Sequence, residues 1–336
     1  MKLGLFWDQT MNIKSYYVKN GTAYDFETNN PYMYHHSVSS NCFPSTHNIQ
    51  FLWDNGVFLN LSEWIDIGRD FPDLDLDIIL YANERAGLDE NQKDDYSVER
   101  LRKRYPKAKI IGYIKEVYVK DTRFENRIKF FKSCDGIHAE AYDSMKKLKE
   151  FKDIERLTNK KITFHPQPLN IDYYYDHFYS NEKINGIYAY LPNPMHRRGR
   201  TYDFAKYIGD KYDLPVCYKP LQEGQKFDHI SQKDFVEMWS PYLYHFNLDP
   251  IPIHPGGQCM QVASVGSINI GGLNEAHHVL YPETATCDEK ILEDRFVEYL
   301  NNPDKRFEVI KYAWEKLNEI HSFSNIKLQL ETLYKN

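Results

Sequence analysis

Residues 240–272 read SPYLYHFNLDPIPIHPGGQCMQVASVGSINIGG, and this stretch predicts a strand, a glycine turn, a short helix and a second strand in direct succession. Leu243 to Phe246 is an apolar, aromatic run of strand length, and the prolines that follow it exclude a helix over the next residues. Ser267 to Ile270 is short and β-branched, which is typical of a strand covered on both faces. A strand, a helix and a second strand in this order indicate a parallel α/β sheet.

The turn before the predicted helix is suited to an anionic ligand. Gly256 and Gly257 let the backbone turn sharply without Cβ atoms, and a helix is expected from Gln258 to about Val265. The unpaired N–H groups at the start of this helix form the positive end of its dipole, where phosphate groups bind. Glycine also occurs at strand-to-helix turns that hold no ligand, so a purely structural role for the glycine pair stays open.

The composition points to a two-domain protein. At 336 residues the chain exceeds what one hydrophobic core usually organises, so two domains are expected. The net charge is −6 and the mean hydropathy is −0.66, and the apolar run near Met1 is too short for a signal peptide, so we expect a cytoplasmic protein without a membrane span. The 5 cysteines form no Cys-x-x-Cys pair, which disfavours a disulfide framework or a zinc site.

The first half of the chain alternates between strand and helix patterns, which predicts parallel pairing in a doubly wound sheet. A hairpin is expected about Asn55-Gly56, in FLWDNGVFLN. The expected strands are Leu3–Trp7, Ile78–Tyr81, Ile110–Ile114, Gly136–Ala139 and Ile162–Phe164. The expected helices are Ser97–Arg104, Phe124–Ser133 and Tyr142–Phe151.

The glycine turn and the order of elements from about Lys183 to Asn336 resemble the C-terminal domain of nucleotide-sugar glycosyltransferases of the GT-B fold. The resemblance implies an α/β architecture with two Rossmann-like, doubly wound domains facing a central cleft. The domains that it implies are an acceptor-side domain over residues 1–175, a nucleotide-sugar donor domain over residues 183–318, and a C-terminal helix over residues 319–336 that crosses back toward the first domain. The segment from His165 to Ser180 resembles the family's interdomain hinge.

The resemblance also implies a donor site. Gln261 holds the place of a glutamate that accepts hydrogen bonds from the ribose hydroxyls, and its amide lacks the charge of that carboxylate. His254 corresponds to a histidine of inverting members only if one residue has been lost between it and Gln261. Ile253 holds the place of the second glutamate of retaining members, so the stereochemistry of transfer stays open. Glu275 lies where many members place an acid that binds the sugar hydroxyls.

A basic loop, LPNPMHRRGR, follows the strand expected over Lys183–Tyr190, and the family places an Arg or Lys at this loop. Guanidinium groups bind phosphate through two hydrogen bonds and would neutralise a leaving diphosphate without a metal ion. A solvated basic turn is the structural alternative. The residues expected at the diphosphate are Arg197, Arg198, Arg200, Gly256, Gly257 and Gln258.

Candidates for the catalytic base lie in the first half of the chain. Asp8 and Glu116 follow expected strands, and they would face the cleft if the sheet is parallel. An Asp-x-Asp pattern at residues 73–77 resembles the metal-binding pair of another class of glycosyltransferases. It precedes a strand, whereas the metal-binding pair follows one, so we expect no metal.

The predicted function is transfer of a sugar from a nucleotide-diphosphate sugar, expected to be a UDP-sugar, to a hydroxyl group of a glycan or other acceptor, without a cofactor. One alternative is a phage-type DNA glycosyltransferase that acts on a hydroxymethylated base. The basic run Arg100–Lys109 favours DNA as a partner, and the negative net charge does not. A second alternative is a non-catalytic binder of sugar nucleotides, since Gln261 replaces a glutamate of the family.

Overall fold

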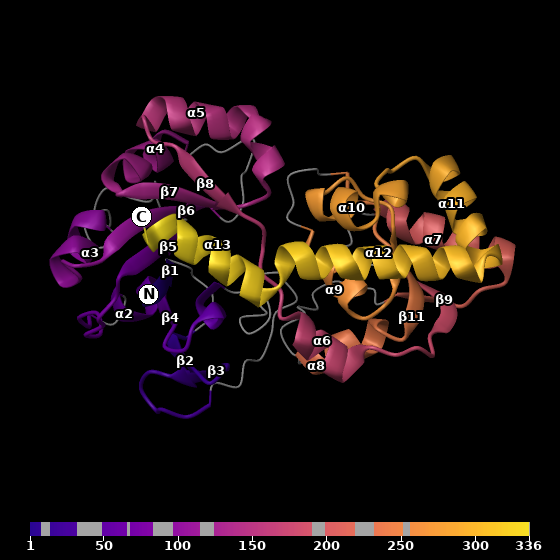
Figure 1. Cartoon of the computed structure of the whole chain (residues 1–336), viewed down its shortest axis with the longest axis horizontal. Coiled ribbons are helices and arrows are strands. Elements are labelled where there is room, and N and C mark those ends of the chain that lie inside the picture. The colour runs from indigo at the N-terminus through magenta and orange to yellow at the C-terminus, as the bar shows by residue number, and fades with distance from the viewer. Residues whose placement is uncertain are drawn as a thin grey trace. The chain divides into compact units, whose positions relative to one another are not determined.

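The structure is a computed structural model that describes residues 1–7, 14–31, 49–65, 68–82, 97–114, 124–189, 199–218, 232–250 and 256–335. The described residues form two compact α/β units (Figure 1). Unit 1 contains the described residues up to Gln167 together with residues 326–335. Unit 2 contains the described residues from Pro168 to Asn325.

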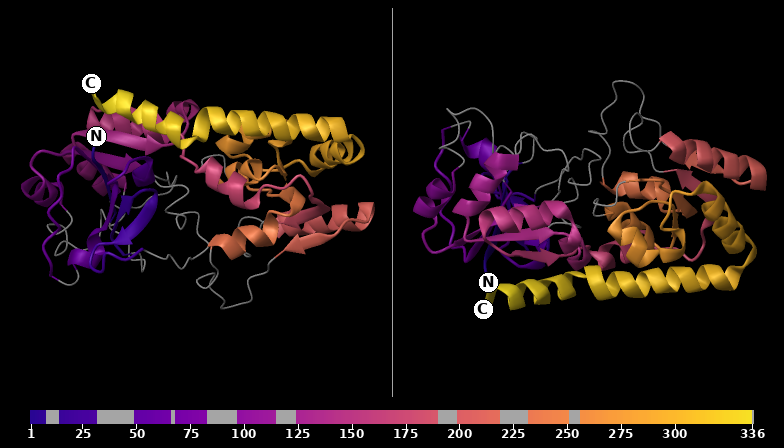
Figure 2. Two further views of the ribbon diagram at one scale, coloured as in Figure 1. Left: turned by 60° about the horizontal axis from the view of Figure 1, so that its bottom comes forward. Right: turned by 90° about the horizontal axis from the view of Figure 1, so that it is seen from above.

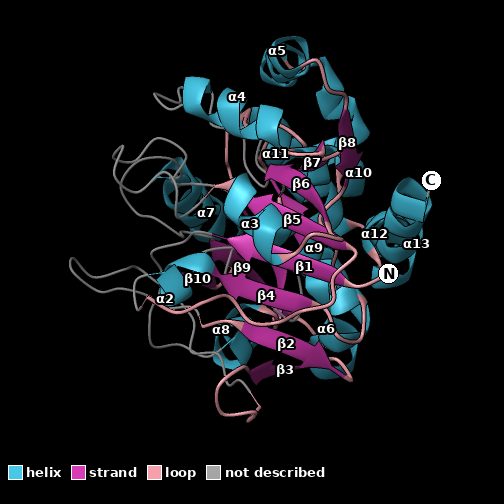
Figure 3. Ribbon diagram, turned by 90° about the vertical axis from the view of Figure 1, so that its left-hand side faces the viewer, coloured by secondary structure: helices cyan, strands magenta, loops and turns pink. Residues whose placement is uncertain are grey.

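Unit 1 is built on an eight-stranded sheet with the strand order β3-β2-β4-β1-β5-β6-β7-β8. Figure 3 shows the strands in this order, from β3 at the bottom to β8 at the top. The strands from β4 to β8 in this order pair in parallel, as the sequence predicted, whereas β2 pairs antiparallel with both β3 and β4. The strands are β1 (Leu3–Trp7), β2 (Tyr16–Lys19), β3 (Thr22–Asp25), β4 (Val57–Asn60), β5 (Ile78–Ala82), β6 (Lys109–Ile114), β7 (Gly136–Glu140) and β8 (Ile162–His165).

Helices cover both faces of this sheet. A Cβ at Gly112 of β6 would lie 2.6 Å from Phe131, so that face is packed against α4. The next residue, Tyr113, points to the other face and stacks on His138, whose Nδ1 lies 2.9 Å from the Tyr334 hydroxyl of α13. The helices of unit 1 are η1 (Ile49–Leu52), α2 (Leu61–Ile65), α3 (Val98–Arg104), α4 (Phe124–Ser133), η3 (Asp143–Lys147), α5 (Lys149–Thr158) and most of α13 (Phe323–Lys335).

Two expectations about unit 1 are wrong. The hairpin lies at Asn20-Gly21, where φ is 50° and 71°, and joins β2 to β3. Asn55-Gly56 instead connects a 3₁₀ helix to β4, because the residues before it do not form a strand. The single helix expected over Tyr142–Phe151 is divided into η3 and α5, because the backbone is extended at Leu148, with ψ of 140°.

Unit 2 is built on a smaller sheet in which all strands are parallel, with the order β10-β9-β11-β12. Phe246 of β11 is fully buried between Phe204 of α7 and Phe296 of α11, at ring-centroid distances of 5.5 and 5.7 Å. Burial of such a ring contributes roughly 1.5–3 kcal/mol to folding. The strands are β9 (Ile184–Ala189), β10 (Val216–Tyr218), β11 (Tyr242–Phe246) and β12 (Ile268–Ile270).

One helix of unit 2 lies in the segment that resembles the family's interdomain hinge. Within the segment His165–Ser180, the Asn170 side chain accepts a hydrogen bond from Tyr173 N at 3.2 Å and begins α6. The helices are α6 (Ile171–Phe178), α7 (Gly199–Tyr212), α8 (Gln232–Trp239), α9 (Gly257–Ser264), α10 (Glu275–Leu280), η4 (Pro282–Thr284), α11 (Glu289–Asn301) and α12 (Pro303–His321). The prediction of a helix from about Gln258 is confirmed.

Both ends of the described chain belong to unit 1, as Figure 2 shows. Within the described ranges, none of the helices has both the length and the apolar character needed to span a bilayer.

Candidate functional site

The segments that follow β11 and β12 meet the start of α9 at the carboxyl edge of the unit 2 sheet. Asn247 N donates to Ile270 O, and Leu273 N donates to Asp249 O, each at 2.9 Å, so the two segments run side by side. The carboxyl edge is where parallel α/β sheets bind their ligands. These segments therefore define the candidate site.

Gly256 fixes the geometry of this site. Its φ is +78°, and a Cβ there would lie 2.2 Å from Asn274 Oδ1 and 2.7 Å from the Ala276 Cβ. Asn274 in turn begins α10, since its Oδ1 accepts a hydrogen bond from His277 N at 2.9 Å. The starts of α9 and α10 are thus held together at a position that only glycine can occupy without strain.

The first turn of α9 leaves backbone donors unpaired. Gly256 offers no side-chain cap, and its carbonyl oxygen accepts from Cys259 N at 2.9 Å and from Met260 N at 3.4 Å. The N–H groups of Gly257 and Gln258 find no acceptor within the part of the chain that the structure describes. Two such donors at the positive end of a helix bind an anionic oxygen.

Unpaired side-chain groups lie beside these donors. Among the residues that the structure describes, neither polar atom of the buried Gln258 amide has a hydrogen-bond partner, and the same is true of Asn247 Oδ1. A buried polar group without a partner costs about 1–3 kcal/mol, so a ligand that supplies partners is favoured here. Asn247 was not predicted from the sequence, although it directly follows β11, a position that could have indicated it.

A buried hydrogen-bond network joins the residues around the starts of α9 and α10. Asn269 Nδ2 donates to His277 Nδ1, and His277 Nε2 donates to Thr284 Oγ1, each at 3.0 Å. Thr284 Oγ1 donates to Asn269 O at 2.8 Å. Cys259 Sγ lies 3.6 Å from His277 Nδ1, and burial lowers the pKa of His277 to about 3. The imidazole is therefore neutral near pH 7, and its role is to hold the starts of α9 and α10 in place.

Gln261 lies deeper than its predicted role suggests. The residue is only 5% exposed, and its Nε2 donates to the Tyr174 hydroxyl of α6 at 3.0 Å. This bond links α9 to α6 inside unit 2. The ribose contact of Gln261 stays a prediction.

The structure places two other predicted donor residues at helix starts. Arg200 is exposed on the first turn of α7, and its Nε and Nη2 donate to Glu289 Oε1 of α11 at 3.1 and 2.6 Å. Glu275 is the half-buried first residue of α10, next to Asn274. Arg200 thus already has an acidic partner on the surface of unit 2.

Five predicted site residues fall outside the described residues, namely Asp8, Glu116, Arg197, Arg198 and His254. The strands before the first two, β1 and β6, end at Trp7 and Ile114 on the carboxyl edge of the unit 1 sheet.

The carboxyl edge of unit 1 also holds a buried polar cluster that sequence reasoning missed. The Tyr113 hydroxyl donates to Glu140 Oε2, and the rings of His138 and His165 lie 4.6 Å apart. Burial lowers the pKa of His138 well below its usual value and that of His165 to about 4. Glu140 and His165 are the last residues of neighbouring strands, and this position is the signal that could have found them.

In the ranges that the structure covers, no group of three or more His, Cys, Asp or Glu side chains could hold a metal ion. The Asp-x-Asp pattern at residues 73–77 precedes β5 and contacts the amino terminus, where Lys2 N donates to Asp77 Oδ2 at 2.7 Å.

Comparison with known proteins identifies the fold. No protein-family model matches the chain, and no curated protein matches its sequence. Among solved structures, an alpha-glucosyltransferase in complex with UDP and a 13-mer DNA containing a central A:G mismatch matches at a TM-score of 0.57 and 12% identity, over 83% of this chain and 85% of that chain. An alpha-glucosyltransferase in complex with UDP-glucose and DNA containing an abasic site matches at 0.55, with 12% identity and the same coverage.

A further match is the N-terminal domain of Candida albicans trehalose-6-phosphate phosphatase, at a TM-score of 0.52 and 11% identity, over 82% of this chain and 72% of that chain. The chain therefore has the α/β fold of the GT-B glycosyltransferases, as the resemblance implied. At these identities the likeness establishes the fold alone.

Proposed function

We propose that the chain is a glycosyltransferase that moves a sugar from a nucleotide-diphosphate sugar, most simply a UDP-sugar, to a hydroxyl group of an acceptor. The observation that carries this proposal is a group of hydrogen-bonding groups at the start of α9 that have no partner in the described ranges, namely the N–H groups of Gly257 and Gln258 and the Gln258 amide. They lie at the edge of a parallel sheet where such a fold binds ligands. In this proposal unit 2 binds the donor and unit 1 the acceptor.

The proposed chemistry follows from the negative charge that develops on the diphosphate as its bond to the sugar breaks. The departing diphosphate gains negative charge, and donors that are already fixed stabilise it without reorganisation. In this proposal the close packing of Gly256 against Asn274 and Ala276 holds the Gly257 and Gln258 N–H groups in place before the diphosphate leaves. Arg197 and Arg198 would add positive charge, and we propose that the reaction needs no metal ion.

Two further parts of the proposal concern the acceptor side and the compartment. Asp8 and Glu116 are the proposed candidates for the base that takes the acceptor proton, because they follow β1 and β6 in the sequence.

The described cysteines are all free, which supports a cytoplasmic enzyme.

The test is an assay of nucleotide release. The protein is incubated with UDP-glucose, UDP-galactose, UDP-N-acetylglucosamine and GDP-mannose, and free nucleoside diphosphate is measured over hours. We expect slow hydrolysis of one donor in wild type and at least about tenfold less in Gly256→Ala, because the fixed donors would be displaced. Release of nucleotide from none of these donors, together with no binding of UDP, would contradict the proposal.

DNA is the second candidate acceptor, because the two glucosyltransferase structures above were solved with DNA. The basic run Arg100–Lys109 gives this candidate only limited support. Arg102 pairs with Asp135 at 2.6 Å, and Arg104 Nε donates to Phe71 O at 2.9 Å, so these cations are used within unit 1. Duplex DNA with hydroxymethylated bases, compared with unmodified duplex and with a free oligosaccharide, distinguishes the acceptors by sugar incorporation.

A further inference from the structure

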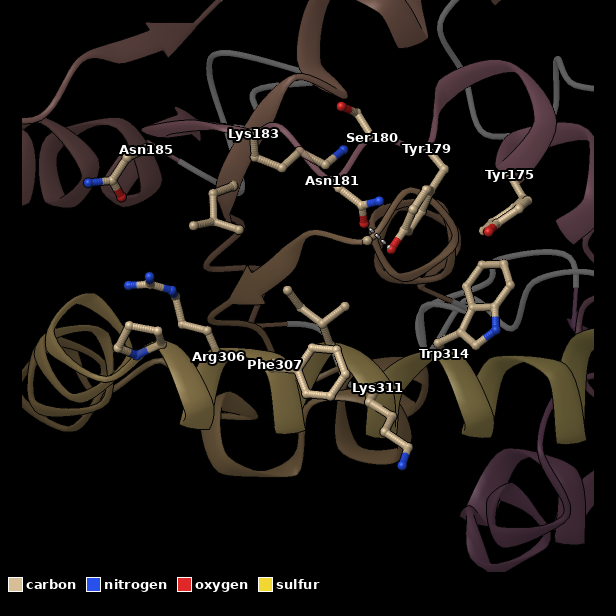
Figure 4. Close-up of a pocket in the computed structure, with 14 residues that line it drawn as sticks. Tyr175, Tyr179, Ser180, Asn181, Lys183, Asn185, Arg306, Phe307, Lys311 and Trp314 are labelled. Atoms are coloured by element: carbon tan, nitrogen blue, oxygen red, sulfur yellow. Dashed lines mark hydrogen bonds between the residues drawn. The ribbon is translucent and has the colours of Figure 1, made fainter.

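Unit 2 contains a cavity of about 650 Å³ at the amino-terminal edge of its sheet, whereas the candidate site lies at the carboxyl edge. Lys183 lines the cavity just before β9 begins, and Gly266 lines it just before β12 begins. Figure 4 shows the cavity between the segment that leads into β9 and the helix α12. Its volume lies within the range of about 300–1,000 Å³ that is usual for ligand pockets.

The Lys183 side chain lies at this cavity without an acidic partner among the described residues. Its Nζ donates to Ser240 O at 2.7 Å, and this carbonyl oxygen carries no full charge. Figure 4 shows the ammonium group directed toward Tyr179. The other charged side chains that line the described part of the cavity, Arg306 and Lys311, are also cations. The surroundings of Lys183 therefore offer its positive charge no counter-charge.

Burial without a counter-charge favours the neutral form of a lysine amine. Burial lowers the pKa of Lys183 from the usual 10.5 to about 8, and no carboxylate of the described residues opposes this shift. The imidazole of His245 in β11 interacts with the charge of Lys183. Burial first, and Lys183 second, lower the pKa of His245 to about 3, so the imidazole is neutral near pH 7. A substantial fraction of Lys183 is thus uncharged near neutral pH.

An uncharged lysine amine at a cavity is a nucleophile. It can donate one N–H to Ser240 O and still direct its lone pair to a carbonyl carbon. Lysines that are desolvated in hydrophobic pockets are activated in this way and form Schiff bases with carbonyl compounds. Leu243 and Ile310 line the same cavity and give it apolar walls.

We propose that Lys183 is a covalent attachment site, at which its amine condenses with the aldehyde group of a small molecule that enters the cavity. The amine nitrogen bonds to the aldehyde carbon and forms a carbinolamine. The aldehyde oxygen then leaves as water with both hydrogen atoms of the amine, so a Schiff base forms without an oxidant or a reductant. This step needs no nucleotide sugar, and its test is therefore independent of the proposed function.

The test compares the labelling rates of two lysines in the wild-type protein. Glyceraldehyde is added briefly at pH 6.5 to 10, borohydride reduces the Schiff bases, and mass spectrometry of peptides identifies the labelled lysines. Lys311 is the internal reference, because it lines the same cavity and is more exposed than Lys183. Lys183→Arg keeps the positive charge but removes the nucleophile, and Lys311→Arg is its matched control.

We expect Lys183 to be labelled at least about tenfold faster than Lys311 at pH 7.5, at a rate that reaches half of its maximum near pH 8. The fast label should be absent from Lys183→Arg and present in Lys311→Arg. The comparison within wild type holds even if a variant does not fold. Labelling of Lys183 no faster than that of Lys311, or a rate at Lys183 that still rises steeply at pH 10, would overturn the proposal.

Discussion

Gly256 and Gln258 contribute to the candidate site in different ways. Gly256 sets the path of the backbone, because its φ of +78° and its contact with Asn274 leave no space for a side chain. Gln258 contributes polar atoms that have no partner in the described part of the chain. A change at the first residue should therefore affect folding and binding together, whereas a change at the second should affect binding alone.

Substitution of Gly256 by alanine tests the first of these statements. The left-handed backbone costs an alanine about 1–2 kcal/mol, and the clash with Asn274 adds to this cost. Gly21→Ala is the matched control, since Gly21 has φ of +71° and no atom within 4 Å of the added Cβ. We expect Gly256→Ala to lower the free energy of unfolding more than the control does and to weaken UDP binding. Equal losses of stability in thermal melts would show that the contact with Asn274 is unimportant.

A comparison of two glutamines on α9 tests the second statement. Gln258→Ala should leave the stability of the free protein unchanged within about 0.5 kcal/mol and should weaken UDP binding about tenfold. Gln261→Ala should instead destabilise the free protein by about 1–3 kcal/mol, because it leaves the buried Tyr174 hydroxyl without this partner. The measurements are urea unfolding and UDP titration. A loss of stability in Gln258→Ala would mean that its amide has a structural partner.

At the scale of elements, the starts of α9 and α10 depend on a histidine that must stay neutral. His277 bridges Asn269 and Thr284, and its folded-state pKa is about 3, compared with about 6.5 for an exposed histidine. A lowered histidine pKa adds stability that is fully present above pH 6.5 and is lost as the pH falls from 6.5 toward 3.

We therefore expect the free energy of unfolding to fall below pH 6.5, by up to about 1.4 kcal/mol per pH unit for each buried histidine of this kind. His245, with a pKa of about 3, and His165, with a pKa of about 4, act in the same direction. His277→Gln should remove the contribution of one histidine to this dependence of the free energy of unfolding on pH. His278→Gln should leave the dependence unchanged, because His278 is exposed. Urea unfolding at pH 5.0 to 7.5 measures the slope. Equal slopes in the two variants would contradict this assignment.

The elements differ in how well the sequence predicted them. Buried parallel strands such as β1 and β12 were found because an apolar run of strand length has few alternatives. The pairs Asn20-Gly21 and Asn55-Gly56 give the same hairpin signal in the sequence. Only Asn20-Gly21 lies between two strands, because strand formation depends on contacts with residues distant in the sequence. The sequence does not predict helix α6 clearly, because two prolines precede it and indicate a turn, although Asn170 is a favourable N-cap.

The candidate site was predicted only in part. The glycine turn and α9 were found because glycine and helix starts leave local signals. Asn247, Asn274 and His277 were not, because their roles depend on which strand ends lie side by side. The partner of Arg200 was likewise hidden, since Glu289 lies on a helix far along the chain.

At the scale of the whole molecule, the last helix joins the end of the chain to unit 1. Glu331 accepts a hydrogen bond from Trp53 Nε1 at 3.3 Å, and Tyr334 bonds to His138. Ile326 and Leu330 are fully buried, and each such side chain contributes roughly 1.5–3 kcal/mol.

Removal of residues 326–336 should therefore destabilise unit 1 by about 5 kcal/mol, which is a large share of a domain's stability. Hydrogen exchange should then speed up in β7 and β8, while β11 and β12 of unit 2 stay protected. Tyr334→Phe, which removes only the hydroxyl group, is the milder control. Equal loss of protection in both units would show that the helix stabilises the whole chain.

If a nucleoside diphosphate binds at the start of α9, the two N–H groups there that have no acceptor among the described residues change their surroundings, and amide NMR during a UDP titration detects this change residue by residue. We expect the Gly257 and Gln258 amide resonances to shift in proportion to the bound fraction, and we expect these shifts to disappear in Gly256→Ala. Saturable UDP binding that leaves both resonances unmoved would contradict it.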